Sequence, residues 1–266
     1  MTRTEPIVKA RNETVLVTGA SSGLGLELAD LFARDGADLI LVARRLERLE
    51  EVAERLTTDH GVRTLVIPMD LSEPGSVDRL AESIHEMGLQ VDVLVNSAGF
   101  GARGPFAAMP ADRVGGMLEV NIGALTNLTR HFLPGMIERG RGGVINLGSL
   151  AGFLPGALMT TYYASKAYVL AFSEALSEEV RGTGVTVCCV APGPTDTGFV
   201  EAAEIEGIRF FQLGAMDARS VAVTGYRAFR KGRALSLPGA STRAAAFLLR
   251  FSPRALTRRV GGWMNR

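Results

Sequence analysis

The sequence contains few cysteines, few histidines and no long apolar run, and each shortage excludes a class of protein. Its 266 residues include two cysteines, the adjacent Cys188 and Cys189. Because neighbouring side chains on a strand point to opposite faces, a disulfide between them is implausible. The pair also lacks the spacing of metal ligands. We therefore expect both thiols to be buried as apolar groups, and we expect no metal site.

Membrane-spanning and secreted proteins are excluded on similar grounds. No apolar run approaches the roughly 18 residues that span a bilayer, and the longest, 185–191, has the length of a strand. Residues 1–13 are polar and lack the apolar core of a secretory signal. With 47% AVILMFWYC and 21% charged residues, the chain can bury a substantial core, which excludes disorder throughout. We expect a cytoplasmic protein.

The formal net charge of +1 conceals a strongly basic C-terminus. The last acidic residue is Asp217, and eleven lysines and arginines follow it. Three interpretations of the basic C-terminal extension, about 242–266, remain open. It completes the domain with its arginines facing water or a subunit interface, or 242–263 makes a peripheral contact with an anionic membrane. The third, nucleic-acid binding, has no recognition motif in its support, and we expect no nucleic-acid partner.

Short runs rich in Val, Ile and Leu alternate with longer amphipathic stretches along the chain. Continuous apolar strands are typical of a parallel sheet that is covered on both faces. Repeated strand–helix–strand units predict a doubly wound, Rossmann-like α/β fold of about seven strands with helices on both faces. The strand candidates are 14–18, 38–43, 63–68, 91–96, 143–147, 185–191 and 234–237. The helix candidates are 23–35, 46–60, 73–88, 112–139, 162–181, 216–231 and 242–251.

Local signals support these boundaries. Ser72 is predicted to cap the helix 73–88, and Gly36 and Gly182 are predicted to end the helices before them. We find no repeat and no linker, so 1–266 is predicted to form a single domain.

A glycine-rich turn follows the first strand and opens a helix. It reads Thr18-Gly19-Ala20-Ser21-Ser22-Gly23-Leu24-Gly25. Such a turn lets backbone N–H groups and the positive helix end approach a pyrophosphate, and its spacing is a variant of the dinucleotide fingerprint. The same residues also fit G-x-S-x-G, the nucleophile elbow of α/β-hydrolases. That alternative needs a histidine after Ser21, but His60, His85 and His131 all fall within helical patterns.

The end of the second strand indicates which dinucleotide binds. The strand ends at Ala43-Arg44-Arg45, where a carboxylate would pair with the ribose 2′-OH of NAD. Arginines suit the 2′-phosphate of NADP(H), although they could also simply open a solvated helix. We predict NADP(H) as the cofactor.

A set of three residues, all of which follow the fifth strand in sequence, predicts carbonyl chemistry. Ser149 follows that strand at the ligand-binding edge of the sheet, and Tyr162 and Lys166 lie four residues apart on one helix face. A buried ammonium beside a phenol lowers the phenol pKa from about 10 toward neutrality. Tyr162 would then exchange a proton with a carbonyl or alcohol oxygen that Ser149 also holds. We predict hydride transfer between NADP(H) and a carbonyl or secondary alcohol, the alternative being a non-catalytic NADP-binding regulatory protein.

With these motifs, the chain resembles the short-chain dehydrogenase/reductase family over about residues 12–200. The resemblance implies a catalytic tetrad of Asn121, Ser149, Tyr162 and Lys166, in which Asn121 supports a proton relay to the lysine. It also implies a homodimer or homotetramer. Ser97 stands where the family has a second asparagine before Ala98-Gly99. The cofactor contacts that the resemblance implies are Gly19, Ser21, Ser22, Gly23, Leu24, Gly25, Arg44, Arg45, Asp70, Leu71, Asn96, Ala98, Gly99, Tyr162, Lys166, Pro192, Gly193, Thr195 and Thr197.

A long loop, about 198–215, carries large apolar side chains. Loops of this kind commonly form lids over apolar ligands, although these residues could instead pack a small helix onto the domain. We expect a lipophilic ketone, aldehyde or secondary alcohol as the substrate. The apolar residues in and beside the loop are Phe199, Val200, Ile205, Ile208, Phe210, Phe211, Leu213 and Met216.

Overall fold

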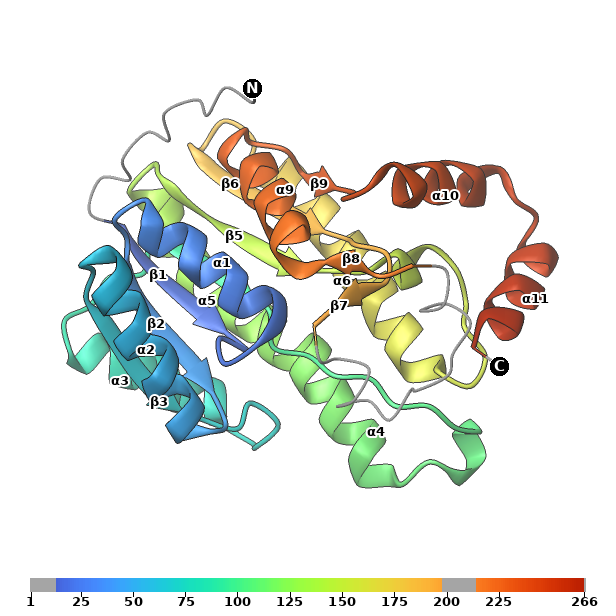
Figure 1. Cartoon of the computed structure of the whole chain (residues 1–266), viewed down its shortest axis with the longest axis horizontal. Coiled ribbons are helices and arrows are strands. Elements are labelled where there is room, and N and C mark those ends of the chain that lie inside the picture. The colour runs from blue at the N-terminus through green and yellow to red at the C-terminus, as the bar shows by residue number, and fades with distance from the viewer. Residues whose placement is uncertain (1–12, 198–213, 266) are drawn as a thin grey trace.

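The computed structural model describes residues 13–197 and 214–265, and its centre is a parallel β-sheet (Figure 1). Seven strands lie in the order β3-β2-β1-β4-β5-β6-β9, and every neighbouring pair is parallel. The strands are β1 Thr14–Thr18, β2 Asp38–Ala43, β3 Thr64–Pro68, β4 Val93–Asn96, β5 Gly142–Leu147, β6 Val185–Val190 and β9 Leu235–Ser236. The chain crosses from β3 to the far side of β1 to form β4, so the predicted doubly wound fold is confirmed.

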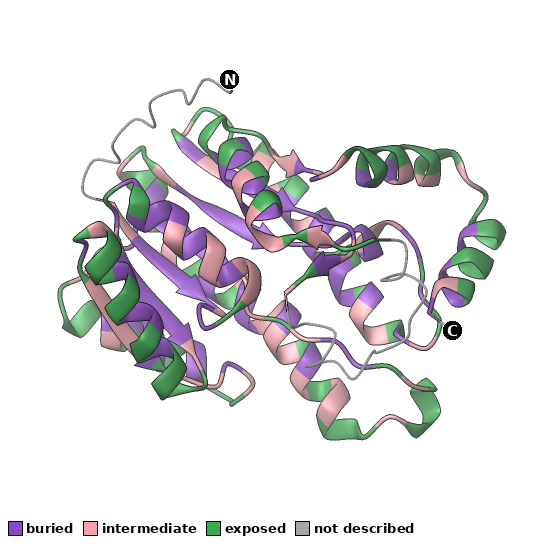
Figure 2. Ribbon diagram, in the orientation of Figure 1, coloured by how far each residue is buried: buried purple, intermediate pink, exposed green. Residues whose placement is uncertain are grey.

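Helices cover both faces of the sheet because each strand buries its side chains in both directions. Val15 and Val17 pack beneath α1 Gly23–Arg34, α2 Leu46–His60 and α9 Ala218–Arg230. Leu16, between them, packs on the other face beneath α3 Ser76–Glu86, α5 Leu125–Glu138 and α6 Thr160–Glu179. Figure 2 shows the buried strands between helices whose outer faces are exposed.

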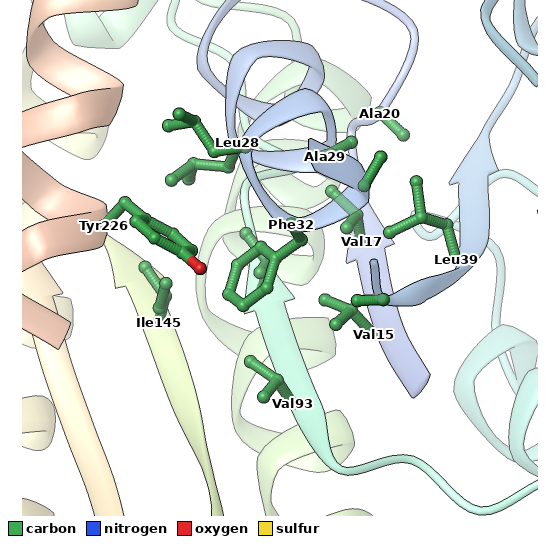
Figure 3. Packing of buried hydrophobic residues seen from close by; sticks show 14 of the residues in the cluster. Val15, Val17, Ala20, Leu28, Ala29, Phe32, Leu39, Val93, Ile145 and Tyr226 are labelled. Atoms are coloured by element: carbon green, nitrogen blue, oxygen red, sulfur yellow. The ribbon is translucent and has the colours of Figure 1, made fainter. Parts of the chain in front are cut away.

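Phe32 of α1 anchors the first of these layers. Its ring is fully buried and lies among Val15, Val17, Val93 and Ile145 from three neighbouring strands (Figure 3). Truncating such a ring to alanine costs about 3–5 kcal/mol, since the rigid sheet below cannot close the cavity. The layer therefore fixes the height of α1 above the sheet, and with it the position of the glycine turn that precedes α1.

Two predicted helices differ from those observed. The stretch 112–139 divides into α4 Ala111–Leu118, a π-helical turn Glu119–Ala124 and α5. The helix predicted from residue 73 begins at Ser76 instead. The prediction that Ser72 caps it was wrong, because the Ser72 amide and hydroxyl both donate to Asp70 Oδ1, at 2.9 and 2.7 Å.

The C-terminal part of the chain forms two helices beside the sheet, α10 Ala240–Phe251 and α11 Arg254–Met264 (Figure 1). The sequence predicted the first of them but not the second. The other expected feature, the lid, falls almost wholly on 198–213, outside the described residues. It is bracketed by a short parallel pair, β7 Thr195–Asp196 and β8 Met216–Asp217.

Two findings bear on the disulfide and the membrane-spanning segment that the sequence excludes. Cys188 and Cys189 are free and buried, as predicted. Across residues 13–197 and 214–265, no helix combines the length and apolar character that crossing a membrane requires.

Candidate active site

A cleft of about 770 Å³ runs along the carboxyl ends of the strands, across the point where the strand order reverses. It gathers most of the predicted site residues. Those that line it are Gly19, Ser21, Ser22, Gly23, Leu24, Arg44, Arg45, Asp70, Leu71, Ala98, Gly99, Ser149, Tyr162, Lys166, Pro192, Gly193, Thr195 and Thr197. Gly25, Asn96 and Asn121 are not among its lining residues.

The glycine turn brings its backbone to one wall of the cleft. Gly19 has φ +66°, and a Cβ atom there would lie 2.8 Å from the Ala98 amide nitrogen. A Cβ atom on Gly25 would lie 2.3 Å from the Gly19 carbonyl oxygen. Thr18 Oγ1 accepts hydrogen bonds from the amides of Ser97 and Ala98, both at 3.1 Å. The turn after β1 and the segment after β4 are therefore held at backbone contact.

The start of α1 fits a phosphate group. Ser22, Gly23 and Leu24 line the cleft at the N-terminus of this helix. The Ser22 side chain makes no capping hydrogen bond, and the first turn contains no acidic residue. The N–H groups and positive dipole end of α1 thus meet the cleft with no acidic residue in the first turn to satisfy them, as a dinucleotide pyrophosphate requires.

Two arginines lie on the rim of the cleft opposite the glycine turn. Arg44 and Arg45 line the cleft where β2 ends, and the Arg44 side chain is 75% exposed. Its Nη1 atom lies 4.0 Å from Asp70 Oδ2. Burial opposes ionisation of Asp70, but hydrogen bonds from Ser72 and the charge of Arg44 outweigh it and lower the pKa of the carboxyl. Asp70 is therefore ionised and attracts the exposed Arg44 side chain at the rim of the cleft.

Ser149, Tyr162 and Lys166 meet at the middle of the cleft. Ser149 follows β5, and its hydroxyl accepts a hydrogen bond from the Ala151 amide at 3.1 Å. The Tyr162 phenol is hydrogen-bonded to Ser149. Lys166, one turn further along α6, donates to the Leu147 carbonyl at 2.7 Å, and its Nζ atom lies 5.8 Å from the centroid of the Tyr162 ring. The hydroxyls of Ser149 and Tyr162 are thus placed to share one ligand oxygen.

The expected depression of the tyrosine pKa is not found. Burial raises the pKa of Tyr162 to about 12, and the hydrogen bond with Ser149 offsets only part of this rise. The lysine ammonium is directed at a backbone carbonyl rather than at the phenol oxygen, so it does not stabilise a phenolate. Burial instead lowers the pKa of Lys166 to about 8. At neutral pH the structure therefore holds a neutral phenol beside a lysine that is still mostly protonated.

Asn121 lies behind the cleft wall, on the π-helical turn. Its Oδ1 atom accepts from the Phe100 amide at 3.1 Å, and its Nδ2 atom donates to the Phe100 carbonyl and to Ser165 Oγ, both at 3.0 Å. A Cβ atom on Gly99 would lie 3.1 Å from Asn121 Oδ1 and 3.7 Å from Lys166 Nζ. The asparagine therefore fixes the loop after β4 against α6, close to the lysine. Its role in a proton relay stays a prediction.

The Asn96 side chain points into the buried layer between the sheet and helices α5 and α6. Its Nδ2 atom donates to Thr129 Oγ1 at 3.1 Å and to Asn146 Oδ1 at 2.9 Å, and Asn146 in turn donates to Ser173 Oγ. This network joins β4 and β5 to α5 and α6. A direct cofactor contact by Asn96 stays a prediction, since its side chain supports the wall without lining it.

One residue at the far end of the cleft, away from the glycine turn, was not predicted from the sequence. Asn265, which follows α11 and is 1% exposed, lines the cleft. Its Oδ1 atom accepts from the Tyr163 hydroxyl at 2.9 Å, and its Nδ2 atom donates to the Ala157 carbonyl at 3.0 Å. Its own carbonyl accepts from Arg103 Nε at 3.0 Å. The basic C-terminal extension thus contributes a buried side chain to the far end of the cleft.

Comparison with known proteins assigns the chain to one family. A family model described as short chain dehydrogenase matches residues 13–206. The chain belongs to the short-chain dehydrogenase family. It is therefore an oxidoreductase with a Rossmann-like fold, of a family that acts on small-molecule carbonyl and alcohol substrates.

Three members illustrate how far the similarity extends. Sulfoacetaldehyde reductase 2 of Chromohalobacter salexigens is 41% identical over 191 residues, covering 71% of this chain and 75% of that protein. Ketoacyl reductase HetN of Nostoc sp. is 34% identical over 202 residues, covering 74% and 70%. The structure of a short-chain dehydrogenase from Sphingobium yanoikuyae in complex with NADPH superposes with a TM-score of 0.81 at 31% identity, covering 91% and 97%.

Proposed function

We propose that this member transfers a hydride between NADP(H) and the carbonyl or secondary alcohol carbon of a lipophilic small molecule. The observation that carries the proposal is the pair of hydroxyls of Ser149 and Tyr162, hydrogen-bonded to each other on the cleft with Lys166 one turn below. The cofactor, when bound, supplies or accepts the hydride. The chain itself must hold the substrate oxygen and move a proton to or from it.

In the reducing direction, the carbonyl oxygen accepts hydrogen bonds from Ser149 and Tyr162, and Tyr162 gives up its proton as negative charge develops on that oxygen. The raised pKa of Tyr162 keeps this proton in place at neutral pH, so the acid form is ready before substrate binds. The tyrosinate left behind would be stabilised by the Lys166 ammonium once that group turns from the Leu147 carbonyl toward the phenol oxygen. Asn121 acts indirectly, through the loop and helix that it joins.

The test of this reaction is a pair of variants at neighbouring tyrosines. We expect Tyr162→Phe to lower kcat by about 10³-fold or more, since the proton donor is lost, while NADPH binding followed by fluorescence is unchanged. Tyr163→Phe, the matched control, removes a hydroxyl that bonds to Asn265 and should lower kcat by less than about tenfold. A Tyr162→Phe enzyme with near-normal turnover refutes the assignment. Absence of NADPH oxidation with every carbonyl of a broad panel favours the non-catalytic regulatory protein instead.

Preference for NADP(H) over NAD(H) is supported by Arg44 and Arg45 at the end of β2. We expect the double variant Arg44→Ala, Arg45→Ala to raise KM for NADPH about tenfold or more and to leave KM for NADH nearly unchanged. Arg48→Ala is the control, because Arg48 pairs with Glu51 at 2.6 Å on the outer side of α2. Equal losses for NADPH and NADH would contradict a 2′-phosphate site.

A lipophilic substrate is supported by the apolar character of the far end of the cleft. Ala151, Met159 and Tyr163, which pack in one cluster, line it there. The two relatives named above differ on this point, since one is named for a small sulfonated aldehyde and the other for ketoacyl substrates. We expect kcat/KM to rise with chain length across a series of aliphatic ketones and aldehydes. Turnover of small polar carbonyls alone would contradict the proposal.

The hydrolase alternative has no support at Ser21. Ser21 lines the cleft, but no histidine is among the described residues that line it. His60 is hydrogen-bonded to Asp30 at 2.9 Å instead.

A homodimer or homotetramer and a cytoplasmic location also stay proposals. The oligomer is supported by an aromatic patch on α6, where Tyr168 stacks on Phe172 with ring centroids 5.6 Å apart and bonds to Thr126 of α5 at 2.9 Å. Light scattering of the protein and of Tyr168→Glu tests it. A monomeric wild-type protein would contradict it.

A further inference from the structure

We propose that the outer face of α10 and α11 docks on the surface of an anionic lipid bilayer. These two helices, 240–264, are called the C-terminal arm below. The proposal concerns where the protein binds and not which reaction it catalyses, so the two can fail separately.

The first observation is the placement of large apolar side chains. Of the large apolar side chains that are exposed among the described residues, half lie on the C-terminal arm. On α10, Phe247, Leu248 and Phe251 are 64%, 65% and 70% exposed. On α11, Leu256, Val260 and Trp263 are exposed as well. The other exposed apolar residues are scattered over separate elements, as is ordinary for a protein surface, so the arm is a distinct patch.

Both helices turn most of their large apolar residues outward. On α10 the buried positions are Thr242 and Ala246, while Phe247 and Phe251 lie one turn apart with ring centroids 5.2 Å from each other. A surface helix of a globular domain normally shows the reverse, with its large apolar side chains facing the core. α10 therefore exposes the face that a helix usually buries.

On α11 the buried positions are Thr257, Gly261 and Gly262. A Cβ atom on Gly261 would lie 2.0 Å from the Pro155 carbonyl oxygen, so the helix backbone is pressed against the body of the protein. Leu256, Val260 and Trp263 follow at spacings of four and three residues, which places them together on the outer face. The arm is thus anchored through its small buried residues together with Leu249 and Met264, and it presents its other large apolar residues to the outside.

The second observation is charge of a single sign. Every charged residue of the arm is an arginine, and all are exposed: Arg243, Arg250, Arg254, Arg258 and Arg259. No acidic residue follows Asp217 in the whole chain. If the arm paired with the arm of a second copy about a two-fold axis, arginines would face arginines with no carboxylate between them. An anionic bilayer accepts both components, since arginines reach the headgroups while Phe, Leu and Trp enter the interface.

Helix length decides how the arm would lie. α10 has 12 residues and α11 has 11, far short of the roughly 20 that span a bilayer. The arm would therefore lie in the plane of the interface. Asn265 follows α11 directly and lines the far end of the cleft, so docking would bring that end beside the bilayer. A lipophilic substrate would enter from there, a consequence that rests on the proposed function.

The test is flotation of the full-length protein with vesicles of phosphatidylcholine, with and without phosphatidylglycerol. We expect association with the phosphatidylglycerol vesicles that weakens as salt is added. Trp263 is the single tryptophan of the chain, so its emission reports the arm alone and should shift to shorter wavelength on binding. The variant Phe247→Ser, Phe251→Ser should weaken association about tenfold or more.

Met87→Ser is the matched control, since Met87 is 51% exposed at the end of α3, and it should bind vesicles as the wild type does. Circular dichroism verifies that each variant is folded. Absence of association with phosphatidylglycerol vesicles at low salt overturns the proposal, as does full association of the Phe247→Ser, Phe251→Ser variant. A wild-type oligomer that this variant dissociates, without vesicle binding, assigns the arm to a subunit contact instead.

Discussion

The two ends of the cleft are built in different ways. At the cofactor end, the Gly19 backbone lies against the Ala98 backbone with no room for a side chain on residue 19, and the Thr18 hydroxyl joins the two segments. At the substrate end, Tyr163 and Asn265 meet through side chains that lie 102 residues apart in sequence. A backbone-built wall suits a ligand that every family member shares. A wall built from distant side chains changes with each substitution and suits a ligand that differs between members.

The largest effect is expected at the backbone-built end. We expect Gly19→Ala to weaken NADPH binding about 100-fold or more, because its methyl group would lie 2.8 Å from the Ala98 amide and separate the turn from the end of β4. Left-handed strain adds about 1–2 kcal/mol of lost stability. Cofactor titration by fluorescence and denaturant unfolding measure the two effects.

Gly61→Ala separates strain from contact. Gly61 has φ +70°, close to the +66° of Gly19, but nothing lies within 4 Å of its would-be Cβ atom. We expect it to lose a similar part of its stability from strain and to keep its affinity for NADPH. Equal cofactor losses in both variants would mean that backbone contact does not define this end.

A smaller effect is expected where the two ends meet, at Lys166. Burial lowers the pKa of this lysine to about 8, so carbonyl reduction should fall about tenfold per pH unit above that value as the ammonium is lost. The contribution of Lys166 to stability has the opposite sign. Between pH 8 and the ordinary lysine pKa, the unfolded chain binds more protons than the folded one, so stability from this group rises with pH.

Measuring kcat and the free energy of unfolding at the same pH values distinguishes these two trends. A fall in kcat that parallels unfolding would contradict the assignment. So would an unchanged pH profile in Lys166→Met, whose residual activity should no longer depend on pH near 8.

The difference between the two ends of the cleft also explains which parts of the site could be predicted from the sequence. The glycine turn, Ser149 at a strand end and the Tyr162–Lys166 spacing are local patterns, and the structure brings them to one cleft. The pKa of Tyr162 was predicted in the wrong direction, because it depends on burial and on where the lysine ammonium points rather than on spacing. Asn265 was missed altogether, since no short-range pattern relates it to a tyrosine on another helix.

The smallest effect is expected at the side-chain-built end. We expect Asn265→Leu to raise KM for a lipophilic carbonyl about tenfold, with kcat changed only a few-fold and NADPH affinity unchanged. Leucine keeps the approximate volume but leaves the Tyr163 hydroxyl and the Ala157 carbonyl without their partner, so the wall shifts while the proton donor stays in place. The variant Tyr163→Phe removes the hydrogen bond between Tyr163 and Asn265 by deleting the tyrosine hydroxyl instead of the asparagine side chain. If Asn265 acts by positioning Tyr163, the double variant should lose less than the sum of the two single losses. Strict additivity, or a loss confined to kcat, would mean that Asn265 is no part of the substrate wall.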